Sequence, residues 1–368
     1  MPECFSSRIV GTSGTAVSRW ILFSALVAGP TLLSKPSLAA ENKSPSVNSP
    51  QCRNLSLSVQ SNKTEFFENK PIARALEKFE RSFAENDSAL FADVASASLQ
   101  KKRNELIKIF DGTVLEYNLQ KTRLQRNSIW EMNAGNEPQP GQTMRCGENE
   151  IQPIYGPLRQ VAVMYSAFSA QQQTRLLVLF ANTNLDNNKD GGLGLVLMQV
   201  QRWTYDGRTP EKLLAEGAQS AAAHDYLVGK ILTEAAARVL ESNPYLITPA
   251  QKPAREQASR LAGQANELQT VLLKPLQDDP SWTPERFAPV FKDGSLAIGL
   301  KIRMKLETAL NDQIKKCLHV GRRVFTTTSS WRKSFSGFEC MPYDLNEDVG
   351  GVPRGGSQYF SWDKLELK

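Results

Sequence analysis

The first regular pattern downstream of a polar N-terminal stretch is an apolar face at helical spacing. Its four residues lie three or four positions apart: Ile72, Leu76, Phe79 and Phe83. This spacing follows the 3.6-residue period of an α-helix and predicts an amphipathic helix. Two shorter helical pieces follow, and the second ends near Gly112. From Leu115 to Gln120 apolar and polar residues alternate, which predicts a strand with one exposed face.

Three further apolar stretches predict strands: Gln160 to Phe168, Arg175 to Asn182, and Leu195 to Tyr205. The middle stretch is apolar at consecutive positions, so both of its faces should be buried and it should lie centrally in its sheet. Helices that precede consecutive strands joined by short loops favour an α+β fold. We therefore expect N-terminal helices packed on a curved antiparallel sheet, followed by an α-helical hairpin and a small mixed C-terminal region.

The helical period returns after the last of these strands. Thr209 and Pro210 are typical of a helix start, because threonine caps the first turn and proline fits its first position. One apolar stripe continues from there to Val239, and a second begins with a capping-box signature at Thr248 and ends before Pro275. These stripes predict an antiparallel helical hairpin. Its seam should consist of small residues that let the helices approach closely: Gly217, Ala221, Ala235, Ala258 and Ala265.

The C-terminal region combines several short patterns. Leu300 to Leu306 alternates with lysine and arginine and predicts a strand with a basic face, and residues 309–317 favour a helical turn or two. Valine, phenylalanine and three threonines predict a strand from Arg323 to Trp331. The patterns divide the chain into a leader (1–39), a flexible segment (40–64), an α+β domain (65–207), a helical hairpin (208–292) and a basic, mixed C-terminal region (293–368).

The leader has the parts of a cleavable signal peptide in their usual order. Arg8 and Arg19 precede an apolar run from Trp20 to Leu33, and Ser37-Leu38-Ala39 is a small-residue cleavage site, so we expect cleavage after Ala39. The run is shorter than the roughly 20 residues that span a bilayer, which predicts no transmembrane anchor in the mature chain. A secreted or periplasmic location follows. An organellar transit peptide is the alternative, because the leader before its apolar run is long and contains serine and threonine.

Removing the leader changes the charge and the cysteine count. The leader carries three basic residues and one acidic residue, so the formal net charge falls from +6 to +4. Four cysteines remain, and an even count in an oxidising compartment favours disulfides. Three connectivities are open. We expect Cys52 to pair with Cys146 and Cys317 with Cys340, because neighbours in sequence usually share a domain. A zinc site at Cys317 and His319 lacks a second ligand pair.

The segment from about residue 70 to 206 resembles the NTF2-like, steroid-isomerase-like group of α+β domains. The resemblance lies in the opening helix with Phe79 to Asp87, in the helical piece through Val94, and in the strands that close at Gln201 to Gly207. It implies helices that close one mouth of a curved sheet over an apolar pocket, which members of the group use for ligands, catalysis or subunit pairing. The Asp and Tyr set of the isomerase-type members has no match here, so no catalytic residue is carried over.

A loop between two predicted strands has the composition of a calcium site. In the run from Asp186 to Gly191, oxygen-bearing side chains alternate and a glycine follows where a calcium loop turns. Leu197 stands where an EF-hand places its bidentate acid, so the loop is not an EF-hand. Asp186, Asn188 and Asp190 could still hold Ca²⁺ in a hairpin loop, and no other cofactor is expected. The alternative is a solvated turn, because the same residue types make turns.

Basic residues cluster near the C-terminus, with aromatic residues between them: Lys301, Arg303, Lys305, Lys315, Lys316, Arg322, Arg323, Arg332 and Lys333. Interleaved basic and aromatic residues can bind nucleic acid, anionic lipid or acidic glycans. Outside the cytoplasm nucleic acid is the least available of these, and we expect none. A solvated strand face and helix face is the plainer interpretation of the same cluster.

No complete catalytic set is present in the sequence. His224 and Asp225 are adjacent, but neighbouring helical residues point about 100° apart, so the two side chains cannot serve one reacting atom. His224 also falls on the apolar stripe, which predicts a buried, hydrogen-bonded histidine. Two Ser-x-x-Lys matches lack the Lys-Thr-Gly that would complete a penicillin-recognising site. The sequence therefore favours a non-catalytic binding or interaction protein of the cell envelope, with an envelope protein, a small ligand or an acidic polymer as partner. An envelope hydrolase that cleaves glycans through a pair of carboxylates is the alternative.

Overall fold

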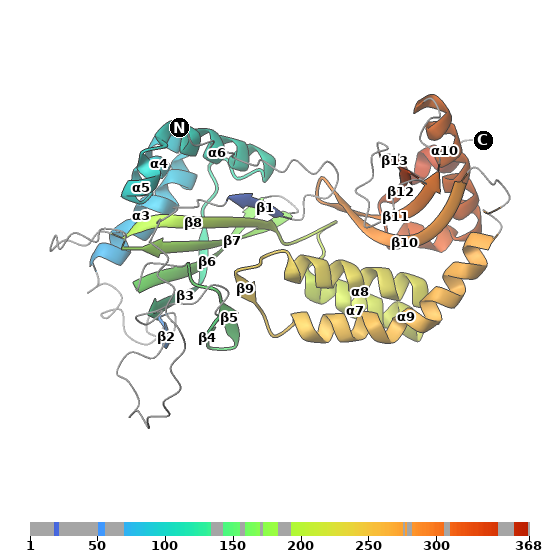
Figure 1. Ribbon diagram of the computed structural model, residues 1–368, viewed down its shortest axis with the longest axis horizontal. Coiled ribbons are helices and arrows are strands. Elements are labelled where there is room, and N and C mark those ends of the chain that lie inside the picture. The colour runs from blue at the N-terminus through green and yellow to red at the C-terminus, as the bar shows by residue number, and fades with distance from the viewer. Residues whose placement is uncertain are drawn as a thin grey trace, which may run out of the picture. The chain divides into compact units, whose positions relative to one another are not determined.

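The helices and strands of the computed structural model form an α+β protein, as the sequence predicts (Figure 1). The structure describes residues 18–21, 51–55, 70–133, 143–154, 159–169, 172–182, 193–274, 277, 282–304, 310–344 and 357–366. The chain folds as two compact units. The first comprises residues 18–202 and 241–249, and the second comprises residues 203–240 and 250 onward.

The first unit is built on a sheet in which all neighbouring strands are antiparallel. Its spatial order is β1 (Ser18–Ile21), β8 (Gly194–Arg202), β7 (Gln172–Ala181), β6 (Arg159–Ser169), β3 (Gln125–Asn133) and β2 (Gln51–Asn54). β7 lies between β6 and β8, as its continuous apolar sequence predicts, because both of its faces are buried. The strand β1 falls within the predicted leader, and the rest of residues 1–39 lies outside the described part of the chain.

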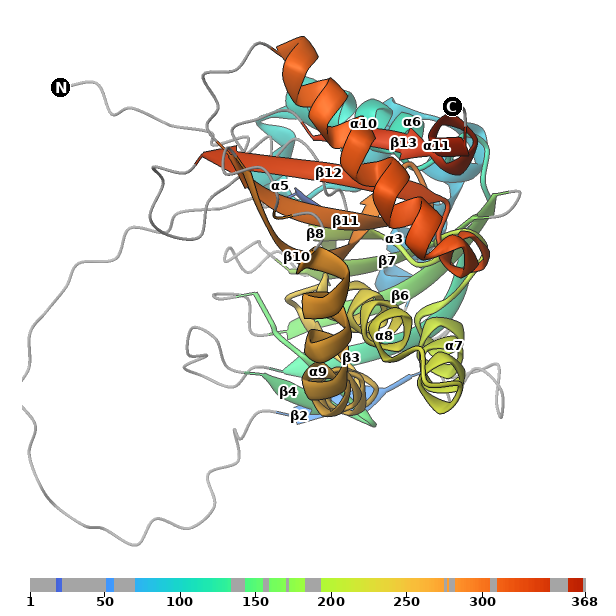
Figure 2. The same ribbon diagram turned by 90° about the vertical axis from the view of Figure 1, so that its right-hand side faces the viewer.

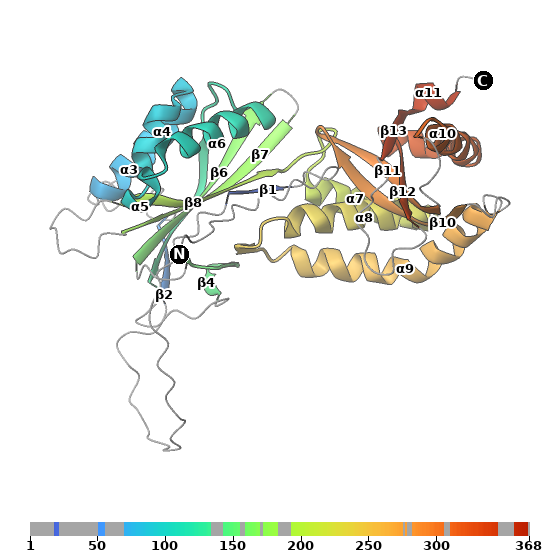
Figure 3. The ribbon, with the colours of Figure 1, turned by 45° about the horizontal axis from the view of Figure 1, so that its top comes forward.

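Four helices lie on one face of this sheet: α3 (Lys70–Glu85), α4 (Ser88–Val94), α5 (Ala97–Gln100) and α6 (Arg103–Glu116) (Figure 3). Phe79 of α3 is fully buried at the centre of an aromatic cluster. The centroid of its ring lies 5.3 Å from that of Phe83, 5.6 Å from that of Tyr165 and 5.8 Å from that of Phe180. Aromatic side chains therefore fill the space between α3 and the strands, where the apolar periodicity of α3 directs them.

The opposite face of the sheet is covered by a small three-stranded sheet of β4 (Met144–Cys146), β5 (Asn149–Ile151) and β9 (Leu246–Ile247). Trp130 is buried there against apolar residues of the small sheet. A disulfide joins Cys52 on β2 to Cys146 on β4, with 2.02 Å between the sulfur atoms. This is the pairing predicted from the cysteine positions.

The strand predicted from Leu115 to Gln120 is wrong, because α6 continues to Glu116. The helix ends in a left-handed residue, Asn118, and the amide of Leu119 donates to the carbonyl of Val114, which is a common way to terminate a helix. Leu115 is 70% exposed. The alternating pattern does not reflect a buried strand face here, because Val114 is buried and Leu115, at the end of the helix, is exposed.

The second unit contains a four-stranded sheet in the order β10 (Trp282–Lys292), β11 (Ser295–Met304), β12 (Gly337–Asp344) and β13 (Gln358–Ser361). β10 and β11 form an antiparallel hairpin, whose Asp293-Gly294 turn has the positive φ angles of a tight hairpin. β11 and β12 are parallel, and α10 (Leu310–Thr327) with the 3-10 helix η2 (Ser329–Lys333) connects them. Figure 2 shows α10 crossing one face of this sheet, and α11 (Trp362–Glu366) ends the described chain.

The strand predicted from Arg323 to Trp331 is also wrong, because these residues complete α10 and form η2. Cys317, Val320 and Val324 are buried at helical spacing, so tertiary packing of one helix face outweighs the strand propensity of the threonines. The hydroxyl of Thr328 donates to the carbonyl of Val324, which satisfies it within the helical backbone. A disulfide joins Cys317 on α10 to Cys340 on β12, as predicted.

Three helices, α7 (Pro210–Ala222), α8 (Tyr226–Glu241) and α9 (Gln251–Leu273), replace the predicted two (Figure 1). The Thr209 cap is confirmed, since its hydroxyl accepts a hydrogen bond from the amide of Lys212. No side-chain cap forms at the start of α9. The predicted small-residue seam instead brings α7 against α8. A Cβ atom on Gly217 would lie 2.9 Å from the carbonyl oxygen of Gly229, so these helices touch through their backbones.

The break between α7 and α8 overturns the expectation of a buried histidine. His224 is exposed and has a left-handed φ of 63°, and its Nδ1 lies 2.9 Å from the hydroxyl of Tyr226. Asp225 then starts α8, where its Oδ1 accepts a hydrogen bond from the amide of Val228. An adjacent exposed histidine and a helix-capping aspartate therefore form a turn and not a catalytic pair.

Asp225→Asn is expected to stabilise the second unit at neutral pH by less than about 1 kcal/mol, because the half-buried carboxyl is screened by water. Burial raises the pKa of Asp225, and the hydrogen bond from Val228 opposes this. Wild-type stability should therefore fall as pH rises through the raised pKa, whereas asparagine caps the helix without charge. Urea unfolding of both proteins from pH 3 to pH 7 tests this. A gain for the variant that is as large in acid as at neutral pH would contradict it.

Candidate functional site

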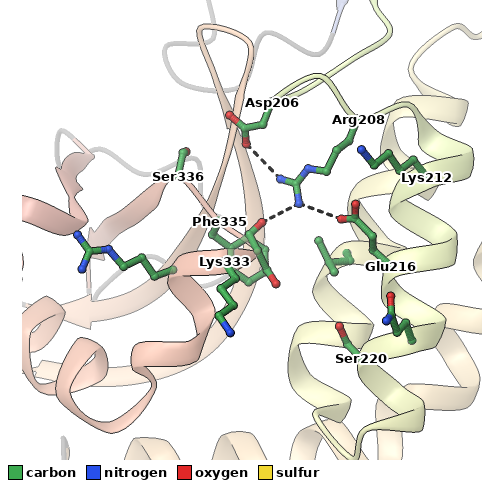
Figure 4. Close-up of a pocket in the computed structure, with 12 residues that line it drawn as sticks. Asp206, Arg208, Lys212, Glu216, Ser220, Lys333, Phe335 and Ser336 are labelled. Carbon is green, nitrogen blue, oxygen red and sulfur yellow. Dashed lines mark hydrogen bonds and ion pairs between the residues drawn. The ribbon is translucent and has the colours of Figure 1, made fainter.

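A polar pocket with a volume of about 560 Å³ lies in the second unit (Figure 4). Its walls come from the turn before α7, from α7 and α8, and from η2 with the segment that follows it. The lining residues are Asp206, Arg208, Lys212, Glu216, Gln219, Ser220, Leu232, Arg332, Lys333, Ser334, Phe335 and Ser336. The pocket thus joins parts of the chain that are far apart in sequence.

A tight turn places Arg208 at the edge of this pocket. The backbone amides and carbonyls of Tyr205 and Arg208 bond to each other at 3.1 and 3.0 Å. Between them Asp206 and Gly207 both have positive φ angles, which glycine tolerates and aspartate accepts in turns. Helix α7 starts directly afterwards at the Thr209 cap. Local turn and capping chemistry therefore fixes the point at which the Arg208 side chain enters the fold.

Arg208 links the turn before α7, α7 and the segment after η2. Its Nη2 donates to Asp206 Oδ2 at 3.1 Å, and its Nη1 donates to Glu216 Oε2 at 3.2 Å and to the carbonyl of Ser334 at 2.8 Å (Figure 4). Asp206 Oδ2 also accepts from the amide of Leu296 at 2.9 Å. The Arg208 side chain is 9% exposed, so its charge is neutralised by carboxylates and not by solvent.

One polar atom of Arg208 stays without a partner. Its Nε is buried and makes no hydrogen bond within the described part of the chain. Buried polar groups are normally hydrogen-bonded, but this nitrogen is covered by protein atoms, so a ligand in the pocket would not reach it.

Two lysines stand on opposite sides of the pocket. Lys212 comes from α7 and Lys333 from η2 (Figure 4). Where the structure describes the chain, neither ammonium group forms an ion pair, whereas Arg332 is engaged by Asp363 at 2.9 Å and by Glu366. One guanidinium faces two carboxylates, so Arg208, Asp206 and Glu216 together carry a net charge of −1 (1 − 2). Lys212 and Lys333 bring the net charge of these five pocket residues to +1 (2 − 1).

The described residues of the predicted basic cluster lie on three elements. Lys301 and Arg303 lie on β11, Arg322 and Arg323 lie on α10, and Arg332 and Lys333 lie on η2. Only Arg332 and Lys333 line the pocket. Lys305 lies outside the described residues. The prediction grouped residues that are close in sequence, and the fold distributes them over three elements.

Sequence reasoning missed Arg208, Lys212 and Glu216. The run from Asp206 to Pro210 indicates a glycine turn followed by a helix cap. This pattern could have placed Arg208 between a turn and the start of a helix. It could not show that η2 lies opposite, because that depends on the packing of α10 and β12.

The predicted calcium loop falls between β7 and β8, which confirms a hairpin at this point. Asp186, Asn188 and Asp190 lie outside the described residues. Over the part of the chain that the structure covers, no group of three or more His, Cys, Asp or Glu side chains could hold a metal ion.

Within the described residues no helix is both long enough and apolar enough to cross a membrane.

Comparison with known proteins found no matching family model, no similar curated protein and no similar solved structure. The resemblance of the first unit to the NTF2-like group therefore stays a prediction, and the site must be interpreted from its own chemistry.

Proposed function

We propose that this chain is a non-catalytic binding protein of the secreted or periplasmic space, and that it holds an anionic ligand in the pocket between Lys212 and Lys333. The observation that supports this is the pair of ammonium groups on opposite walls, both free of carboxylate partners in the described structure. A ligand carboxylate or phosphate would supply the missing charge to both. It would form charge-assisted hydrogen bonds, which are stronger than those between neutral groups.

The dimensions and polarity of the pocket suit a small ligand. Its volume of about 560 Å³ falls in the range of about 300 to 1,000 Å³ typical of small-molecule sites. Ser220 and Gln219 add neutral hydrogen-bonding groups beside the two lysines, and Leu232 and Phe335 add apolar surface. These features favour a small polar anion with a hydroxylated body, such as a sugar acid.

Two observations support a location outside the cytoplasm. The first is the leader with its basic start, apolar run and small-residue cleavage site. The second is the pair of disulfides, because such bonds persist in oxidising compartments and are rare in the cytosol.

The alternative, a glycan hydrolase, requires two acids that face the substrate. Asp206 and Glu216 are the acids that line the pocket, and both accept hydrogen bonds from the same Arg208 guanidinium. A glycosidase needs one acid to protonate the leaving oxygen and a second to act opposite it. Carboxylates tied to one arginine fit a structural role better, which is why we prefer binding.

Isothermal titration calorimetry of the mature protein with glucuronate and with inorganic phosphate tests the proposal. Lys212→Ala and Lys333→Ala should each weaken binding about tenfold, equivalent to about 1.4 kcal/mol. Lys252→Ala, an exposed α9 lysine of the same unit, is the matched control and should bind as the wild type does. Absence of heat for both probes at millimolar concentration, or equal losses in all three variants, would refute the proposal.

A further inference from the structure

A second group of positive charges lies along β10 and β11, away from the lysine pocket. Arg286 and Lys301 are register partners in this hairpin, so their side chains project from the same face of the sheet. The opposite face carries Phe287 and Leu300, which are buried in the apolar core. Arg286 is exposed and Lys301 is partly exposed. The hairpin thus presents two neighbouring cations on the face opposite Phe287 and Leu300, at the end of that face beyond the buried Ala288 and Val290.

A third cation reaches this group from α8. Arg238 Nη1 donates to the carbonyl of Pro289 on β10 at 3.0 Å. Gln269 of α9 binds the same strand, accepting from the amide of Phe287 at 2.9 Å. These side-chain bonds satisfy backbone groups of the edge strand and hold Arg238 beside it. Its position is therefore fixed by the fold.

The three cations act on one another. Burial lowers the pKa of Lys301, and the positive charges of Arg286 and Arg238 lower it further, while Glu285 opposes this effect. Like charges close enough to shift a pKa repel one another, and an anion placed among them would relieve that repulsion.

The nearest carboxylates are already engaged by other cations. Glu285 pairs with Arg303 at 2.7 Å, and Glu234 pairs with Lys230 at 2.7 Å. Across the described ranges no carboxylate forms an ion pair with Arg238, Arg286 or Lys301. Glu234 still acts on Arg238 and Glu285 still acts on Lys301, but these two carboxylates face five cations, so the group with Lys230 and Arg303 included keeps a net charge of +3 (5 − 2).

We infer that Arg238, Arg286 and Lys301 form a binding surface for an acidic polysaccharide. The three charges come from three neighbouring elements and lie at the surface, so they suit repeated carboxylates of an extended polymer better than a single small anion. Two arginines favour carboxylates, because the planar guanidinium binds them in a bidentate manner. Tyr343, whose hydroxyl lies 3.2 Å from Arg303 Nε, adds an aromatic ring near the same strands. This inference rests on the proposed extracytoplasmic location and is independent of the lysine pocket.

Binding of the mature protein to immobilised polygalacturonate at several salt concentrations tests the inference. The double variant Arg286→Ala/Lys301→Ala should bind at least about tenfold more weakly and depend less on salt, because fewer counterions are released. Both side chains reach solvent, so the variant should retain the wild-type circular dichroism spectrum. Arg260→Ala/Lys315→Ala, at exposed positions on α9 and α10, is the control and should bind normally.

The outcomes separate this inference from the proposed function. A Lys212→Ala/Lys333→Ala protein should lose glucuronate but keep polygalacturonate. Unchanged polymer binding by Arg286→Ala/Lys301→Ala would overturn the inference, and so would no binding to polygalacturonate at low salt. Tighter binding to RNA or to anionic lipid vesicles than to polygalacturonate would overturn the choice of polymer.

Discussion

Loss of the Cys52–Cys146 disulfide should lower the free energy of unfolding of the first unit by about 4 to 5 kcal/mol. The two cysteines are 94 positions apart, and a cross-link that closes so long a loop removes much of the entropy of the unfolded chain. The bond also ties β2, which lies at the edge of the large sheet, to β4 of the small sheet. Hydrogen exchange in denaturant of Cys52→Ser/Cys146→Ser, read on peptides from β6 and β7, measures the effect.

The second disulfide provides the control. Cys317 and Cys340 are only 23 positions apart, so Cys317→Ser/Cys340→Ser should cost about 3 kcal/mol, and the loss should appear in peptides from β11 and β12. Unchanged exchange of the first unit in the Cys52→Ser/Cys146→Ser protein would show that the bond does not restrain the chain. Equal changes in both units for either variant would contradict the expectation that each bond stabilises its own unit.

Arg208→Ala should destabilise the second unit by about 3 to 5 kcal/mol, because it leaves Asp206 and Glu216 without their shared cation. The carbonyl of Ser334 also loses its donor. Arg208→Lys should recover only part of this loss, since one ammonium cannot reproduce the fork that reaches three acceptors. Chemical denaturation followed by the fluorescence of buried tryptophans such as Trp331 measures the transition.

A compensating variant distinguishes charge from packing in this prediction. Removing the two negative charges in Asp206→Asn/Arg208→Ala/Glu216→Gln should restore part of the stability that Arg208→Ala loses, because no uncompensated carboxylate remains. Arg332→Ala, which breaks only exposed ion pairs with Asp363 and Glu366, should cost less than about 1 kcal/mol. An Arg208→Ala protein as stable as Arg332→Ala would contradict the structural role of Arg208.

This role for Arg208 separates the structural residues of the pocket from those that can bind a ligand. Arg208, Asp206 and Glu216 hold the walls together, and Lys212 and Lys333 remain available to a ligand. The arrangement explains how a pocket with acids on its wall can attract an anion. The same separation of paired from unpaired cations distinguishes the surface on β10 and β11, where Arg303 forms an ion pair with Glu285, and Arg286 and Lys301 form none within the described residues.

Local signals in the sequence determined several features by themselves. The apolar run of β7 implied a central strand, because a segment without a polar face must be buried on both sides. Thr209 and Pro210 implied a helix start, because the cap and the fixed φ angle act within a single turn. The cysteine pairs followed from proximity in the chain. The strand and the helix start depend on one continuous segment each, whereas Cys52 and Cys146 lie 94 positions apart and were paired only from their order among the cysteines.

Only the tertiary structure decided the remaining features. Leu115 belongs to a helix end and Val324 to a helix, because packing against the core selects which face of an ambiguous segment is buried. The left-handed turn at His224 splits a stripe that is compatible with one continuous helix. Lys212 and Lys333 face one pocket because α10 and η2 return the chain to α7, a long-range arrangement that residue periodicity does not encode.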